Sequence, residues 1–280
     1  MKKFLLLSSQ RSASTYVSLW LNGHPAIESH SEVFLPHYGA PDGFARYCDR
    51  RLYRKVCKWL FLNRAAQSLP VNFTPYTIIE SYLVSLFHAP HHSGPWSDIR
   101  SWNEHMPRKP GSDCIGFKLM YSQLKTYPQL MKWLIRNKDV RILHLIRTNH
   151  LKTFISIVRK AETKLAHTDR QVKTRPVHIN LKQLWKFIQK QEARVQFHRA
   201  LFSRQYPYYE FTTEAFFSKR NTIENDIFRF LNIPACNIPQ PGLKQISSSR
   251  IENEIANYQD VINSLEPTEY AYLLTDFIIR

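Results

Sequence analysis

Short apolar segments alternate with helical patterns along most of this chain, and this alternation limits the folds open to it. Segments with the composition of buried strands are residues 3–7, 114–119, 140–146 and 208–211, with a further extended segment at residues 26–34. Segments with helical spacing are residues 15–22, 123–136, 150–160, 181–203 and 224–231. Strands that alternate with helices predict an α/β fold, with a central parallel sheet flanked by helices.

One long segment breaks the alternation. Residues 44–110 are irregular, with a basic, helical first part and a second part rich in His and Pro. The sequence contains no internal repeat, low-complexity tract or clear linker. We therefore expect a single domain over residues 1–280, with residues 44–110 as a mainly helical insertion or lid.

The charge balance is strongly basic. Lys and Arg number 39 against 22 Asp and Glu, a formal net charge of +17, so the surface attracts anions. Nucleic acid, an anionic membrane, an acidic polysaccharide and a phosphorylated cofactor all fit this charge. Cations are dense in residues 158–204, which we interpret as a solvated helix face, with docking of an anionic glycan or lipid headgroup as the alternative.

Cysteine spacing and hydropathy indicate the compartment. The four cysteines lie far apart with no C-x-x-C spacing, which disfavours a zinc site or disulfide framework and suits a reducing compartment. The apolar run at residues 4–7 is shorter than the roughly 7 to 15 residues of an export signal. We expect a cytoplasmic protein, soluble or peripheral to a membrane.

The loop after the first predicted strand is rich in small hydroxylated residues. In an open parallel sheet, ligands bind beyond the carboxyl ends of the strands. Backbone N–H groups, hydroxyls and a helix N-terminus at residues 9–15 would together cradle a tetrahedral anion. The run lacks the glycines and lysine of a Walker A loop, although Arg11 could stand in for the lysine. The alternative is a helix N-cap that binds no ligand.

A second pair of polar residues follows the strand at residues 140–146. Arg147 leaves this strand, and Ser156 lies nine residues later, two turns into the next predicted helix. An arginine fork and a serine hydroxyl suit a terminal phosphate held away from the reacting group. An arginine at a strand end is otherwise a common surface charge.

Together, the two sites resemble the 5′-phosphosulfate loop and the 3′-phosphate motif of sulfotransferases that use 3′-phosphoadenosine 5′-phosphosulfate (PAPS). The nine-residue spacing is similar to that of bacterial nodulation-type and trehalose-type carbohydrate sulfotransferases. The segment at residues 116–124, Gly-Phe-Lys-Leu-Met-Tyr-Ser-Gln-Leu, is also similar to that group. Ala13 is a departure, since the family usually has glycine there, and it matters if the backbone needs a positive φ.

The resemblance implies a P-loop-like three-layer fold, PAPS as sulfuryl donor and a hydroxyl of a carbohydrate or glycolipid as acceptor, with residues 44–110 on the acceptor side. A peripheral contact with an anionic membrane fits the charge, and no nucleic acid is expected as a partner. The residues expected to bind the cofactor are Arg11, Ser12, Ala13, Ser14, Thr15, Arg147, Ser156, Lys244 and Arg250.

The resemblance also implies the catalytic residues. Glu32 stands where similar carbohydrate sulfotransferases carry their catalytic glutamate, so it is the expected general base. If its segment is extended, His30 points to the same face and is the other candidate. Arg11 and Lys118 are the candidate cations near the transferring group. The alternatives are an exposed strand-end charge for Glu32 and snorkelling to solvent for Lys118.

The sequence also bears on other possible functions. A cluster of histidines, His88, His91, His92 and His105, lacks a second ordered ligand pair, and we expect no metal. A kinase-like phosphoryl transferase would need a P-loop lysine and a magnesium-binding carboxylate, neither of which is found. A basic glycan-binding or nucleic-acid-binding protein without catalysis would need neither Glu32 nor Arg147.

Overall fold

A five-stranded parallel sheet forms the centre of the protein. The computed structural model describes residues 1–35, 43–45, 75–87, 109–163, 175–242 and 250–275. The strands are β1 (Lys2–Ser8), β2 (Ile27–His30), β3 (Cys114–Met120), β4 (Arg141–Ile146) and β5 (Tyr208–Thr212). Their order is β2-β3-β1-β4-β5, and every neighbouring pair is parallel. The predicted α/β fold with a central parallel sheet is confirmed.

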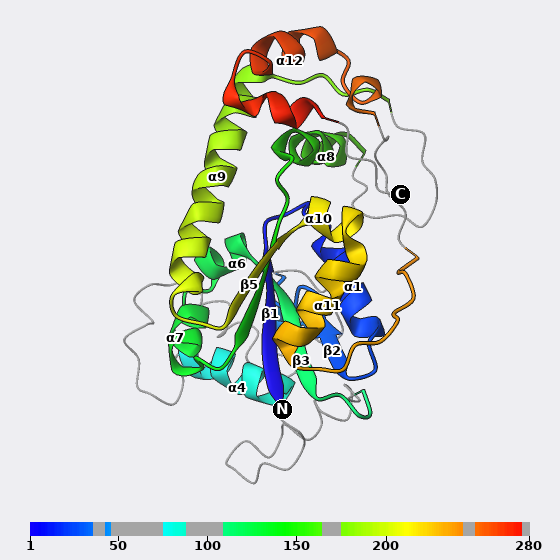
Figure 1. The fold of residues 1–280 in the computed structure, drawn as a ribbon. Helices are drawn as coiled ribbons and strands as arrows, with labels where there is room; N and C mark the ends of the chain where they lie inside the picture. The colour runs from blue at the N-terminus through cyan, green and yellow to red at the C-terminus, as the bar shows by residue number, and fades with distance from the viewer. Residues whose placement is uncertain (36–42, 46–74, 88–108, 164–174, 243–249, 276–280) are drawn as a thin grey trace.

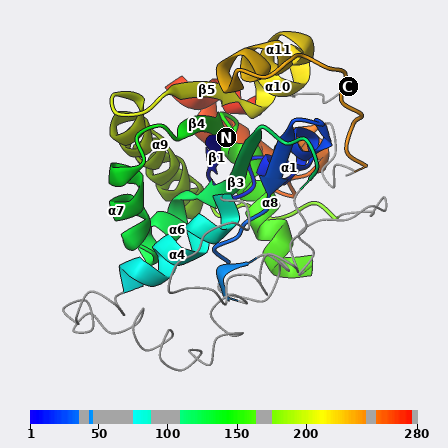
Figure 2. The same ribbon diagram turned by 90° about the horizontal axis from the view of Figure 1, so that it is seen from below.

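Helices cover both faces of this sheet and give three layers (Figures 1 and 2). One face packs against α1 (Ser14–Gly23), α10 (Thr213–Ser218) and α11 (Arg220–Leu231). The other packs against α4 (Pro75–Phe87), α6 (Tyr121–Thr126), α7 (Gln129–Arg136) and the C-terminal half of α9 (Leu181–Ser203).

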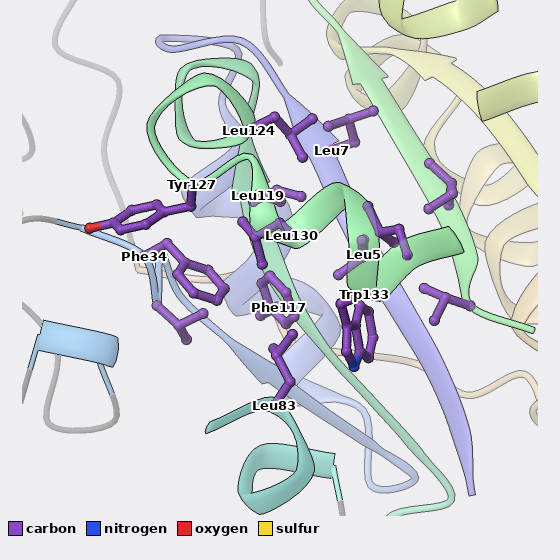
Figure 3. Packing of buried hydrophobic residues seen from close by; sticks show 14 of the residues in the cluster. Leu5, Leu7, Phe34, Leu83, Phe117, Leu119, Leu124, Tyr127, Leu130 and Trp133 are labelled. Carbon is purple, nitrogen blue, oxygen red and sulfur yellow. The ribbon is translucent and has the colours of Figure 1, made fainter. Parts of the chain in front are cut away.

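The central strand, β1, shows why helices cover both faces of the sheet. Along β1, Leu5 and Leu7 point to the α7 side, while Phe4 and Leu6 point to the α1 side. All four are at most 1 % exposed, so the strand is apolar on both faces, as is typical of a parallel strand in a three-layer fold. Figure 3 shows the apolar cluster on the α7 side of the sheet, in which Phe117 and Trp133 fill the space between the sheet and the helices.

A third apolar cluster lies beyond the carboxyl ends of the strands (Figure 1). It joins α8 (His150–Thr163) and the N-terminal half of α9 to η3 (Ile251–Asn253), α12 (Tyr258–Leu265) and η4 (Glu269–Leu274). A single parallel bridge between Val177 and Ile255 links these segments. The polar loops at the strand ends therefore lie between the sheet and this cluster.

Two helix predictions differ from the structure. The helix predicted at residues 123–136 is divided into α6 and α7, because Pro128 lacks an N–H and restricts the residue before it. Helix α10 was not predicted, since its six residues are too short for a periodic pattern. Within the insertion predicted at residues 44–110, α4 buries Tyr82 and Leu83 in the core beside α7, and most of the remainder lies outside the described residues.

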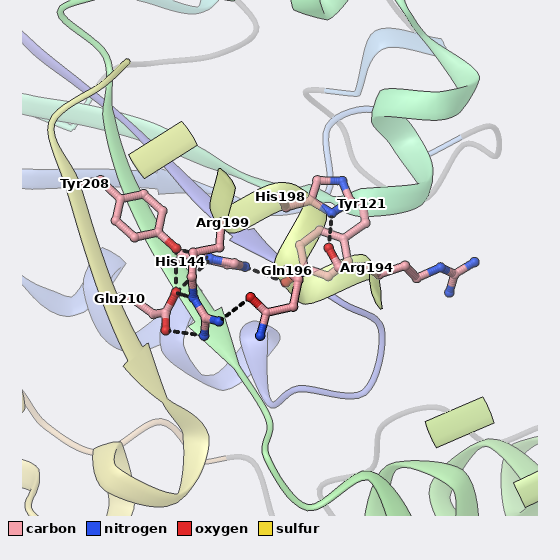
Figure 4. Close-up of polar contacts among 8 residues, drawn as sticks. All are labelled: Tyr121, His144, Arg194, Gln196, His198, Arg199, Tyr208 and Glu210. Atoms are coloured by element: carbon pink, nitrogen blue, oxygen red, sulfur yellow. Dashed lines mark hydrogen bonds and ion pairs between the residues drawn. The ribbon is translucent and has the colours of Figure 1, made fainter. Parts of the chain in front are cut away.

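A partly buried polar cluster crosses β4 and β5 on the α9 side (Figure 4). Tyr208 Oη donates to Glu210 Oε2 at 2.6 Å, so its oxygen accepts from His144 Nδ1–H. His144 Nε2 is then left as the acceptor of the Tyr121 hydroxyl proton. Arg199 completes the chain with two hydrogen bonds to Glu210, of 2.6 and 2.8 Å. These directions assign a neutral His144 that carries its proton on Nδ1.

Two buried histidines should make the fold sensitive to acid: His144 of this cluster, and His198 of α9, whose ring stacks on Tyr121. Burial lowers the pKa of His144 and of His198, so both are neutral in the fold at pH values where the unfolded chain begins to bind protons. Their stabilising contribution is complete above about pH 6.5 and is lost as the pH falls through the folded-state pKa. The free energy of unfolding should therefore decrease below pH 6.5, by up to about 1.4 kcal/mol per pH unit for each such histidine.

Urea denaturation at pH 7.5, 6.5 and 5.5 measures this slope. His198→Gln should reduce the slope, whereas His178→Gln, at an exposed position, should leave it unchanged. A free energy of unfolding that stays constant from pH 7.5 to 5.5 would contradict the prediction.

Candidate functional site

Two residues of the loop between β1 and α1 have a left-handed backbone conformation. Arg11 has a φ of 62° and Ala13 a φ of 58°, both in the region that favours glycine. Two hydrogen bonds of 2.8 Å hold the turn, one from Ser12 Oγ to the carbonyl of Ser9 and one from Thr213 Oγ1 to the carbonyl of Ser12. Alternating left-handed residues before a helix N-terminus are typical of an anion-binding backbone nest.

The positive φ of Ala13 predicts a stabilising substitution. A Cβ in the left-handed region costs roughly 1 kcal/mol, which Ala13→Gly would remove, against a smaller gain in the entropy of the unfolded chain. Thermal denaturation should show an increase in Tm of up to about 3 °C for Ala13→Gly. Ala13→Val, with a branched side chain at the same φ, should lower Tm, and the two variants moving in the same direction would contradict this account.

The two predicted phosphate motifs meet in the structure. Arg147 NH1 donates to the carbonyl of Arg11 at 2.9 Å, and Arg11 Nε donates to Ser156 Oγ at 2.8 Å. Segments separated by more than 130 residues thus converge on one region at the carboxyl ends of β1 and β4. Burial lowers the pKa of both arginines, and the charge of Arg11 lowers that of Arg147 further. Two desolvated cations beside each other favour an anion between them.

The turn after β4 is held by α10. Glu214 Oε1 and Oε2 accept from the backbone N–H groups of Asn149 and Thr148, at 3.0 and 3.1 Å. Asn149 Oδ1 in turn accepts from the N–H of Lys152 at 2.9 Å and so caps the first turn of α8. These contacts hold the backbone in place directly after Arg147, where the chain leaves β4.

Lys118 lies at the centre of the catalytic candidates. Its Nζ donates to Thr15 Oγ1 at 2.8 Å and lies 2.8 Å from Glu32 Oε1. The Lys118 side chain is 2 % exposed, which excludes the alternative of snorkelling to solvent. Glu32 is 22 % exposed, so its carboxylate is reachable from solvent while it is held against the lysine.

His30 and Glu32 have different partners. Strand β2 ends at His30, so the alternation that would place both side chains on one face does not reach Glu32. His30 Nε2 lies 3.1 Å from Glu28 Oε1, two residues earlier on the same strand. Of the two candidates for general base, Glu32 is the one in contact with Lys118.

The remaining predictions fall partly outside this site. Lys244 and the histidines at positions 88, 91, 92 and 105 lie outside the described residues. Arg250 is largely exposed, and its NH1 lies 3.3 Å from Glu252 Oε1. Within the described ranges, no group of three or more His, Cys, Asp or Glu side chains is arranged to hold a metal ion.

Sequence reasoning missed the residues that support the site from α10. Thr213 and Glu214 directly follow β5, the strand farthest from β2 in the sheet, so their position beside the first loop depends on the sheet order. The available signal was Thr212, whose side chain accepts from the N–H of Ala215 and begins a helix. That signal predicts where a helix starts, but not which distant residues the helix contacts.

The fold and the site together define a class of protein: an α/β protein with a left-handed loop before a helix N-terminus and two arginines at the carboxyl ends of its parallel strands. Scans of the chain against protein-family models and against curated proteins find no match. None of the helices in the part of the chain that the structure describes is long and apolar enough to span a membrane.

Several solved structures resemble the chain at low sequence identity. A sulfotransferase from Alicyclobacillus acidocaldarius has a TM-score of 0.45 and 12 % identity, over 98 % of this chain and 96 % of that one. A sulfotransferase domain from the curacin biosynthetic pathway has a TM-score of 0.42 and 14 % identity, over 84 % and 76 %. The sulfotransferase domain of the Synechococcus PCC 7002 olefin synthase has a TM-score of 0.41 and 15 % identity, over 92 % and 82 %.

Proposed function

We propose that the protein is a sulfotransferase that moves a sulfuryl group from PAPS to a hydroxyl of a carbohydrate or glycolipid, with Glu32 as general base. The observation that carries this proposal is the convergence of Arg11, Arg147 and Ser156, which joins a loop suited to one phosphate with a fork suited to another.

The donor set fits a nucleotide with two separate anionic groups. Residues 12–15, at the N-terminus of α1, suit the 5′-phosphosulfate, because N–H groups and hydroxyls bind tetrahedral anions there. Arg147 and Ser156, from β4 and α8, suit a 3′-phosphate. The donor brings the activated sulfuryl group, and the chain supplies charge, orientation and a proton acceptor.

Glu32 would accept the proton of the acceptor hydroxyl as that oxygen forms its bond to sulfur and the bond between sulfur and the phosphate oxygen breaks. Its carboxylate is partly exposed, and the ammonium of Lys118 holds it in place at 2.8 Å. Lys118 also contacts Thr15, so one cation links the proposed base to the loop proposed to hold the leaving phosphate. Lys118 and Arg11 would stabilise the negative charge that develops on that phosphate.

Calorimetric titration with adenosine 3′,5′-bisphosphate tests the donor class. Parallel titrations with 5′-AMP and with ATP plus magnesium provide the comparison. Selective binding of the bisphosphate supports the proposal, tighter binding of ATP supports a kinase-like activity, and the absence of binding by all three supports a non-catalytic basic protein. The acceptor is then identified by transfer of labelled sulfate from PAPS to candidate sugars and glycolipids.

A further inference from the structure

The cations of the basic stretch at residues 158–204 differ in whether they have an acidic partner. Of the cations in residues 158–204 that the structure describes, Arg159 is buried against Glu254 and Arg199 is paired with Glu210. The group that remains, on the long helix α9 and at the residue that directly follows it, is exposed and forms no hydrogen bond or ion pair through its side chains with any described residue. Its members are Lys182, Lys186, Lys190, Arg194 and Arg204.

Four of these cations lie within α9 and share one side of it, and Arg204 caps its C-terminus with a helical backbone conformation. At about 100° per residue they fall within an arc of about 120°, and Phe197 falls inside the same arc. The opposite side carries the buried residues Leu184, Ile188, Val195 and Phe202. The acidic residue of α9, Glu192, lies outside the arc and accepts a hydrogen bond from Tyr270 at 2.7 Å. We call the five cations with Phe197 the α9 cationic face.

The arrangement of charge destabilises the helix taken alone. Lys182, Lys186, Lys190 and Arg194 follow one another at intervals of four residues, and like charges at this spacing repel. No acidic residue lies three or four positions from any of them to relieve the repulsion. A row of cations kept on one helix side without counter-charges is complementary to an anionic surface.

The shape and composition of the face favour a membrane. Helix α9 runs along one side of the molecule, so its cations form a row about 33 Å long on that side (Figure 1). Three of the first four cations are lysines, which act as hydrated point charges and give no bidentate fork for a particular sulfate or phosphate. Phe197 is 64 % exposed in the middle of the cationic arc, where an aromatic ring would enter the headgroup region.

We propose that the α9 cationic face docks the protein on the surface of a membrane that contains anionic lipids. The apolar side of α9 remains in the protein core, so the contact is peripheral and electrostatic, with Phe197 as its apolar element. This inference stands independently of the proposed sulfuryl transfer.

Co-sedimentation with lipid vesicles tests the proposal. The whole protein is mixed with vesicles of phosphatidylcholine and phosphatidylserine at 7:3, and with vesicles of phosphatidylcholine alone. We expect binding to the first and not to the second, and weaker binding as salt increases. The triple variant Lys182→Gln, Lys186→Gln, Lys190→Gln should bind about 100-fold more weakly, at roughly fivefold for each cation removed.

A matched variant removes the same charge elsewhere. Lys125→Gln, Lys160→Gln, Lys219→Gln changes three exposed lysines outside the α9 cationic face and should bind within about threefold of the original protein. Circular dichroism checks that both variants are folded. An equal loss in both variants, or no binding to the anionic vesicles at low salt, overturns the proposal. It is also overturned if heparin or RNA binds through the same three lysines more tightly than the vesicles do.

Discussion

Glu32→Gln should abolish sulfuryl transfer while leaving the affinity for adenosine 3′,5′-bisphosphate within about twofold. The amide has nearly the shape of the carboxylate and can still meet Lys118, but it accepts no proton from an acceptor hydroxyl. Loss of a general base lowers kcat by about 10²- to 10⁴-fold. Turnover with PAPS and a carbohydrate acceptor, measured beside calorimetric titration of the bisphosphate, separates the two quantities.

Glu28→Gln is the matched control for this prediction. Glu28 lies four residues earlier, within β2, and its carboxylate is near His30 instead of Lys118. If Glu32 is the base, Glu28→Gln keeps most of its activity. The reverse pattern, in which Glu32→Gln is active and Glu28→Gln is not, would transfer the role of base to His30 with Glu28 as its partner.

Arg147→Ala should weaken binding of the bisphosphate by about 1.5 to 3 kcal/mol, roughly 10- to 150-fold. The guanidinium would lose its bonds to the 3′-phosphate, and the carbonyl of Arg11 would lose its donor. The affinity for 5′-AMP should change much less, because that nucleotide has no 3′-phosphate. Calorimetric titration with both nucleotides therefore measures a loss of selectivity as well as of affinity.

Arg141→Ala serves as the control on the same strand. Arg141 begins β4, and its guanidinium donates to the carbonyl of Phe230 at the opposite end of the strand from Arg147. It should leave the selectivity for the bisphosphate intact even if it lowers stability. Equal losses of affinity for both nucleotides in Arg147→Ala would place this arginine outside the 3′-phosphate site.

Much of the fold could be predicted because its signals are local. The apolar run of β1 and the strand at residues 140–146 are buried on both faces, and this leaves continuous hydrophobic segments in the sequence. The bounds of α9 match the predicted helix at residues 181–203. Errors arose where the signal was weak, as at Pro128 between two short helices and at the six-residue α10.

The candidate site could be predicted only in part. Arg11, Arg147 and Ser156 were recognised as two ordered motifs, but their contacts with one another depend on the parallel pairing of β1 with β4. The contact of Lys118 with Glu32 likewise depends on β3 lying between β1 and β2. These are long-range pairings, which no window of neighbouring residues records.

By itself, the sequence determined the α/β class, the order of the strands and of most helices, the basic charge and the two candidate phosphate motifs, because periodicity, composition and spacing are properties of the chain. The tertiary structure decided which charged side chains meet. It buried Lys118 between Thr15 and Glu32 and brought Thr213 and Glu214 into contact with the loops that follow β1 and β4. It also left the cations of α9 facing solvent. The physical reason is that burial and pairing of a charge depend on the order of the strands and on the packing of helices on them, which join residues far apart in the chain.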